Sequence, residues 1–347
     1  MRIVDLRSDT VTLPTPAMRE AMYRAELGDD VYGEDPTVNR LQQMAAERLG
    51  KEAALFVVSG TMGNLVSVLT HCGRGDKVIM GDKAHTFLYE AGGVSALGGV
   101  HVHTVPNLPN GMLDPAAVEA AICDEDIHSP RTRLVCLENT HNRCGGAVLS
   151  PAQMATIRQV ALKHDLPVHL DGARIFNAAV ALDIDAREIA ALADSVQFCF
   201  SKGLSAPVGS VICGPASFIS EARRNRKVVG GGMRQAGVLA AAAIVALEQM
   251  VDRLAEDHAN ARILAEGLAE IPGFSVNLET VQSNIVIFGL SDPRIQIGDV
   301  IKGLAGEGVK MGTIDPAHFR AVTHYGITRE DVDSTLVAAR KVMSRRA

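Results

Sequence analysis

The sequence has no apolar stretch suited to crossing a membrane and no concentrated positive charge. No run of 18 residues is both apolar and free of charge, so no transmembrane span is expected. Lys and Arg number 34 against 40 Asp and Glu, which gives a net charge of −6, and no basic block is present. These absences argue against a membrane or a nucleic acid as partner.

The cysteines show no pattern typical of a metal site or a disulfide framework. The chain has 6, none in a CxxC motif or at zinc-like spacing, and several lie in apolar, strand-like runs. We expect reduced, buried thiols and no catalytic metal. Residues 1–7 lack the apolar core of a signal peptide, so we expect them to belong to the mature fold. A cytoplasmic enzyme is predicted.

The sequence does contain a regular alternation of helix and strand patterns. From about residue 37 to 215 this alternation predicts an α/β fold with a mostly parallel sheet flanked by helices. An Ala- and Leu-rich helix, continuous or interrupted, is expected from about residue 234 to 271, followed by shorter strands and a final helix. We expect an N-terminal arm (residues 1–14), a large domain (15–240) and a smaller α/β C-terminal domain (241–347).

Two chemically active residues follow apolar, strand-like segments. Lys202 comes after residues 195–200 and Asp171 after residues 166–170, so both are expected at one edge of the sheet, where ligands of open α/β proteins bind. Pyridoxal phosphate needs a lysine for its Schiff base and a carboxylate for its pyridine nitrogen. The alternatives are a solvated strand-end lysine and, for Arg174, either an ion pair with Asp171 or a contact with the cofactor or a substrate carboxylate.

Other polar residues lie at the ends of neighbouring strand-like segments. Gly60 and Thr61 occupy a strand-to-helix turn, where unpaired amides and the helix dipole favour a phosphate, although no P-loop motif is present. His85 follows residues 77–80 and is either a structural residue or an aromatic plate that exchanges protons near neutral pH. His128 and His141 are loop candidates of the same kind.

A charged residue interrupts an apolar strand near the C-terminus. Arg320 stands within residues 319–323, where burial of a guanidinium is costly unless an anion meets it. An α-carboxylate can pair with an arginine through two parallel hydrogen bonds, and the alternative is an internal salt bridge. The polar residues Ser8 and Asp9 are candidates for an arm that folds back over the site.

Taken together, these segments resemble the low-specificity L-threonine aldolases, which are pyridoxal-phosphate enzymes of the aspartate-aminotransferase fold (fold type I). The resemblance covers nearly the whole chain in order and spacing, and it is the joint occurrence of the segments that makes it specific. The matching segments are residues 5–12, 28–36, 59–64, 138–142, 169–174, 201–203 and 230–235.

The resemblance implies a role for each candidate residue. It implies that Lys202 forms the Schiff base, that Asp171 partners the pyridine nitrogen and that His85 stacks on the ring. The implied ligands of the phosphate are Gly60 and Thr61, and those of the substrate carboxylate are Ser8, Arg174 and Arg320.

The resemblance also implies an assembly and an activity. Family members are usually homotetramers with active sites at a dimer interface, where Arg234 and Lys227 would lie near a neighbouring subunit's cofactor. His128 matches a position that influences preference at the β-carbon. The implied reaction is a reversible retro-aldol cleavage of L-threonine or L-allo-threonine to glycine and acetaldehyde, with His85 as first and His128 as second candidate for the base.

Two other functions are possible for such a chain, and the sequence differs from the family's usual pattern at one place. The runner-up enzyme is an aminotransferase or a β-eliminating lyase with the same cofactor, and the non-catalytic alternative is a cofactor-binding or interaction protein that retains the fold. The family's C-terminal arginine usually follows Ile or Leu and precedes Leu, whereas here Phe319 and Ala321 flank Arg320. We therefore expect carboxylate binding to be kept and the packing beneath it to differ.

Overall fold

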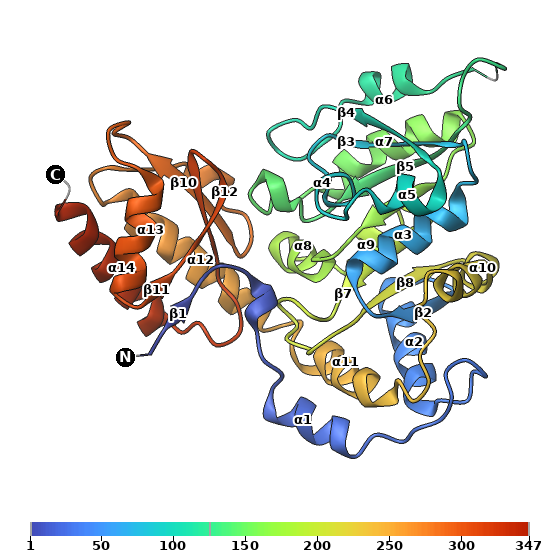
Figure 1. Cartoon of the computed structure of the whole chain (residues 1–347), viewed down its shortest axis with the longest axis horizontal. Helices are drawn as coiled ribbons and strands as arrows, with labels where there is room; N and C mark the ends of the chain where they lie inside the picture. Colours follow the sequence, from blue (N-terminus) through green and yellow to red (C-terminus); the bar gives the residue numbers. More distant parts are fainter. Residues whose placement is uncertain (1, 125, 346–347) are drawn as a thin grey trace.

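The computed structural model describes residues 2–124 and 126–345, so residues 1, 346 and 347 of the predicted arm and C-terminal domain lie outside the described part. Two bodies lie side by side, and the N-terminal strand β1 (Val4–Asp5) lies against the C-terminal body (Figure 1).

A seven-stranded sheet forms the middle of the larger body. Its order is β2-β8-β7-β6-β5-β3-β4, in which β3 to β7 are parallel and β8 is antiparallel to β7 and β2. The predicted α/β fold with a mostly parallel sheet is confirmed. The strands are β2 (Ala53–Val57), β3 (Lys77–Gly81), β4 (His101–Val105), β5 (Thr132–Glu138), β6 (Val168–Asp171), β7 (Ser195–Cys199) and β8 (Ser210–Gly214).

Helices cover both faces of this sheet. Successive residues of β3 belong to different apolar clusters, Val78 and Met80 to one and Ile79 to the other, as expected when alternate side chains point to opposite faces. The helices of this body are α1 (Pro16–Tyr23), α2 (Pro36–Leu49), α3 (Gly60–His71), α4 (His85–Leu88), α5 (Gly93–Gly98), α6 (Pro115–Ala121), α7 (Pro151–Lys163), α8 (Ile175–Leu182), α9 (Ala186–Ala190), α10 (Ala216–Val228) and α11 (Gly237–Gln249), with the 3-10 turns η1 (Asp9–Val11) and η2 (Asn142–Cys144).

The smaller body contains a four-stranded antiparallel sheet in the order β12-β13-β10-β9. Strand β1 pairs with β11 in parallel, and Val4 and Leu6 are buried in the core of this body. Its elements are α12 (Leu254–Ala269), β9 (Phe274–Val276), η3 (Leu278–Thr280), β10 (Ile285–Leu290), α13 (Ile297–Gly306), β11 (Val309–Lys310), β12 (Gly312–Asp315), β13 (His318–Val322) and α14 (Arg329–Ser344).

The Ala- and Leu-rich segment forms two helices rather than one. Helices α11 and α12 are separated by residues 250–253. Helix α11 and Leu254 belong to the core of the larger body, whereas Ala261 and later buried residues belong to that of the smaller body. The domain limits remain a prediction, and the limit at 240/241 falls within α11. None of the described helices is long and apolar enough to cross a bilayer.

Candidate active site

The carboxyl ends of the parallel strands bring the predicted site residues together. Asp171 ends β6, and Lys202 lies in the turn between β7 and β8. His85 begins α4 shortly after β3. This edge of the sheet faces the C-terminal body (Figure 1). A cavity of about 310 Å³ lies there, and its lining includes five predicted residues from the arm, the larger body and β13: Ser8, His85, Arg174, Lys202 and Arg320.

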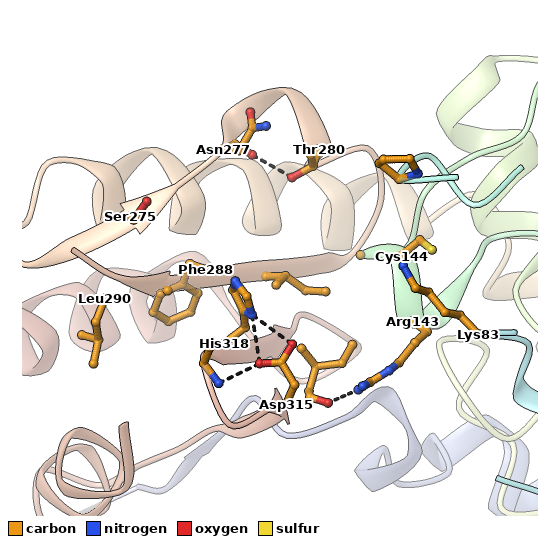
Figure 2. A pocket seen from close by; sticks show the side chains of 16 residues that line it. Lys83, Arg143, Cys144, Ser275, Asn277, Thr280, Phe288, Leu290, Asp315 and His318 are labelled. Carbon is orange, nitrogen blue, oxygen red and sulfur yellow. Dashed lines mark hydrogen bonds and ion pairs between the residues drawn. The ribbon is translucent and has the colours of Figure 1, made fainter. Parts of the chain in front are cut away.

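A larger cavity of about 650 Å³ lies apart from this chemistry. It is formed by the C-terminal sheet and by the segment around Arg143, which donates a hydrogen bond to the Ile314 carbonyl (Figure 2). Ile314 lines both cavities, but none of the predicted site residues is part of the larger one. The larger cavity is therefore no candidate for the catalytic site.

Asp171 is a buried carboxylate whose two oxygens accept three hydrogen bonds. Asn64 Nδ2 donates to Oδ2 at 2.8 Å, and Gln197 Nε2 and the Ala173 N–H donate to Oδ1 at 2.9 and 3.0 Å. Burial acts to raise the pKa of Asp171, but the charges of Lys202 and His85 and the hydrogen bonds from Asn64 and Ala173 hold it below its usual value. A lowered pKa favours the ionised form of Asp171.

Arg174 does not pair with Asp171, which was one of the two expectations for it. Its Nε and Nη2 donate to the two carboxylate oxygens of Asp9 at 2.7 and 2.8 Å, and both side chains are buried. Burial acts to raise the pKa of Asp9, yet the Arg174 charge keeps that pKa well below its usual value. Asp9 therefore ties the arm to Arg174, which lines the pocket.

Arg320 has neutral partners and no ion pair with an acidic residue in the part of the chain described. Nη1 donates to the Arg7 carbonyl at 3.1 Å and Nη2 to Asn142 Oδ1 at 2.8 Å, while the buried Nε has no hydrogen-bond partner among the residues that the structure describes. Burial and the neighbouring Arg174 charge lower the pKa of Arg320 to about 10, so it remains a cation at neutral pH. Its charge is left for an anion.

His85 is held by two buried carboxylates that the sequence did not single out as functional. Its Nδ1 lies 2.8 Å from Glu90 Oε1, and its backbone N–H donates to Glu138 Oε2 at 2.7 Å. Burial acts to lower the pKa of His85, but the bond to Glu90 and the charge of Asp171 raise it overall. Oε1 of Glu138 also accepts the Asn142 N–H at 2.8 Å, so one carboxylate supports both His85 and the partner of Arg320.

The start of α3 fits a phosphate. Ser59 caps the helix by accepting the Met62 N–H at 3.2 Å, which leaves the first amides pointing outward. A Cβ at Gly60 would come within 2.8 Å of Cys199 Sγ, so a larger residue would clash there. Thr61 is exposed at the same helix end.

Asp171, Gly60 and Thr61 do not themselves line the cavity of about 310 Å³, and four other candidates also lie outside it. His128 is exposed and its Nδ1 lies 2.6 Å from Asp126 Oδ1. Arg234 is exposed and pairs with Asp29 at 3.4 Å, and Lys227 lies in the last turn of α10. His141 is buried beside Glu138, which raises the pKa of His141 to about 9 against the effect of burial. The roles given to His128, Arg234 and Lys227 remain predictions.

His85, Glu90 and Asp171 offer ligand atoms that all lie within 4.8 Å of one another, a spacing that a metal ion could also use. These atoms already serve a hydrogen-bond network, in which Glu90 Oε1 accepts from Asn64 Nδ2 at 2.8 Å as well as bonding His85. That Asp171 would partner the nitrogen of a pyridine ring and His85 would stack on its face remains a prediction, and a carboxylate and an imidazole are chemically suited to those roles.

The donor set fits pyridoxal phosphate. Asp171 is a carboxylate at a strand end whose pKa is held below its usual value, partly by the charge of Lys202, which lines the pocket, and the first amides of α3 point outward at the same edge of the sheet. Arg320 adds an unmatched positive charge for an amino-acid carboxylate. The fold and the site thus define a pyridoxal-phosphate-dependent enzyme of fold type I.

Comparisons with known proteins identify the family. The family model for β-eliminating lyases matches residues 5–290. Low-specificity L-threonine aldolase 1 of Arabidopsis thaliana is 49% identical, with 99% of this chain and 97% of that protein covered. The low specificity L-threonine aldolase of Escherichia coli K12 is 43% identical over 99% and 100% of the two chains. A solved structure of Leishmania major threonine aldolase has a TM-score of 0.84 at 23% identity, covering 98% and 99%.

The chain therefore belongs to the β-eliminating lyase family and, within it, to the low-specificity L-threonine aldolases. It is a pyridoxal-phosphate-dependent lyase, as the sequence predicted.

Proposed function

We propose that the chain cleaves the Cα–Cβ bond of L-threonine and related β-hydroxy-α-amino acids, reversibly, to glycine and an aldehyde such as acetaldehyde. The observation that carries the proposal is that Lys202 and Arg320 line the same pocket and that Arg320 forms no ion pair with an acidic residue in the described part of the chain. An amine that holds a carbonyl cofactor and a cation that holds a carboxylate are what an α-amino acid requires. The names of the family relatives support the same substrate class.

Pyridoxal phosphate, when bound, supplies an electron sink for the bond that breaks. Lys202 would hold it covalently, and the amides at Gly60 and Thr61 would hold its phosphate. Asp171, kept ionised by its three donors, would keep the ring nitrogen protonated.

The residues across the pocket orient the amino acid. Arg320 would receive the substrate carboxylate, with Ser8 and Arg174 beside it. Fixing the carboxylate fixes the rotation about Cα, so it decides which bond lies perpendicular to the ring.

His85 is the proposed base for the β-hydroxyl proton. With Nδ1 donating its proton to Glu90 Oε1, Nε2 is the nitrogen left to take up a proton. His128 is the second candidate for this base. Because His128 is exposed on a loop, this role would require the loop to approach an active-site pocket.

We propose a homotetramer with active sites at a dimer interface. Large apolar side chains are exposed on the single chain, among them Tyr23 at 86%, Tyr32 at 77% and Val228 at 79%. Such residues favour contact with another copy. In that assembly Lys227 and Arg234 would reach the neighbouring cofactor. The six free cysteines support a cytoplasmic location.

The products distinguish this function from its alternatives. The holoenzyme incubated with L-threonine should release acetaldehyde and glycine in equal amounts. A keto acid would indicate an aminotransferase, and ammonia with a keto acid a β-eliminating lyase. Failure to bind pyridoxal phosphate would favour a non-catalytic role.

A further inference from the structure

Asn64 is a buried residue of α3 that joins two buried carboxylates, those of Asp171 and Glu90. Its Nδ2 lies 2.8 Å from Asp171 Oδ2 and 2.8 Å from Glu90 Oε1, and its Oδ1 lies 3.2 Å from His169 Nε2. The residue is 1% exposed. An amide has two N–H donors and one acceptor oxygen, and here each one has a partner.

The chemistry of these partners fixes the direction of every hydrogen bond. Burial raises the pKa of Glu90, and its hydrogen bonds with His85 and Asn64 act in the opposite direction, favouring the ionised form. An ionised carboxylate only accepts, so the amide nitrogen faces Asp171 and Glu90, and the reverse orientation would place an oxygen against both. The amide oxygen must then accept, which requires His169 to carry its proton on Nε2.

The same reasoning extends the chain away from the pocket. His169 Nδ1, which then has no proton, accepts from Ser195 Oγ at 2.9 Å, and Ser195 Oγ accepts from His71 Nε2 at 2.8 Å. Burial lowers the pKa of His169 to about 3 and that of His71 to about 4, in keeping with two neutral rings. The hydrogen bonds therefore run in one direction, from His71 through Ser195, His169 and Asn64 to Asp171.

We propose that Asn64 is a positioning residue whose two N–H groups keep Asp171 and Glu90 ionised side by side, and that His169 fixes its orientation. Two carboxylates this close repel each other, and without a shared donor one of them would take up a proton. Asn64 thereby couples the partner of the pyridine nitrogen to the residue that orients His85. The inference rests on the proposed roles of Asp171 and His85.

The test is the affinity of the apoenzyme for pyridoxal phosphate, measured by absorbance titration of the full-length protein. Asn64→Asp replaces a double donor by a third carboxylate and should weaken binding roughly tenfold or more, one pKa unit being a factor of ten. His169→Leu removes the donor that orients Asn64 and should weaken binding roughly threefold. His169→Gln restores an N–H at about the same place and should bind within a factor of about two of the wild type.

Asn177→Asp is the matched control, because Asn177 is also buried and also bonded to a histidine, His258, at 3.1 Å. It should leave the affinity unchanged. Wild-type affinity in Asn64→Asp, or equal weakening by His169→Leu and His169→Gln, would overturn the inference. If Asn64→Asp does not fold, the two His169 variants decide. Wild-type affinity in Asp171→Asn would instead refute the proposed role of Asp171.

Discussion

The two walls of the pocket differ in how completely their charges are matched. Arg174, on the wall built by the sheet edge and the arm, is paired with Asp9, and Asp171, at the same edge of the sheet, accepts three hydrogen bonds. On the wall built by the C-terminal body, Arg320 has neutral partners and a buried Nε without any among the described residues. A complete network suits a group that stays in place, whereas an unmatched charge suits a substrate that enters and leaves.

Loss of the lysine on the sheet-edge wall should have the largest effect. Lys202→Ala removes the amine that would hold the cofactor, so both the absorption of the lysine–cofactor adduct and the cleavage of threonine should vanish. Lys83→Ala, which changes a lysine of the larger cavity, serves as control and should keep both. An active Lys202→Ala protein would contradict the proposed mechanism.

Breaking the matched pair should destabilise the fold. Asp9→Asn leaves the buried Arg174 without a countercharge and should lower the free energy of unfolding by about 3–5 kcal/mol, measured by denaturant titration. The pKa of Asp9 is lowered in the folded state, so its contribution is present above about pH 4 and is lost as the pH falls.

The surface pair of Asp292 and Arg294 provides the comparison, since Asp292→Asn should leave the free energy of unfolding almost unchanged. An equal decrease in the free energy of unfolding in Asp9→Asn and Asp292→Asn would show that the buried pair stabilises the fold no more than the surface pair.

Neutralising the unmatched charge should weaken substrate binding rather than stability. Arg320→Gln should raise the KM for threonine and lower kcat/KM about 10- to 100-fold, because hydrogen bonds to charged groups contribute about 1.5–3 kcal/mol. Steady-state kinetics measure this, and Arg294→Gln on the surface of the same body should behave as wild type. An unchanged KM in Arg320→Gln would mean that the carboxylate binds elsewhere.

The smallest expected effect concerns pH. Glu90 raises the pKa of His85 against the effect of burial, so Glu90→Gln should lower it. Because neutral His85 is the proposed base, the acidic limb of the kcat/KM profile should move to lower pH. The stabilisation from the charged pair is present below about pH 6.5, the unfolded value, and is lost as the pH rises through the raised folded pKa.

Glu119→Gln is the control for this profile, because Glu119 contacts His164 at 3.3 Å on the surface. Its profile should match the wild type. An unmoved acidic limb in Glu90→Gln would show that His85 does not titrate in the rate-determining step.

The sequence predicted the sheet-edge wall better than the contacts behind it. Apolar strands followed by Asp171 and Lys202 locate both residues at one edge, because parallel strands end together. No periodic pattern could pair Arg174 with Asp9, which lies 165 positions earlier in the chain. The bond between Glu90 and His85 depends on how the short segment after β3 folds, and alternation of apolar residues does not report it.

The most direct test of the account is a crystal structure of the holoenzyme with glycine. We expect the pyridine nitrogen to lie within hydrogen-bonding distance of Asp171, Lys202 to lie beside the carbonyl-derived carbon of the same ring, and the glycine carboxylate to contact Arg320. A ring nitrogen remote from Asp171, or a carboxylate bound away from Arg320, would contradict it.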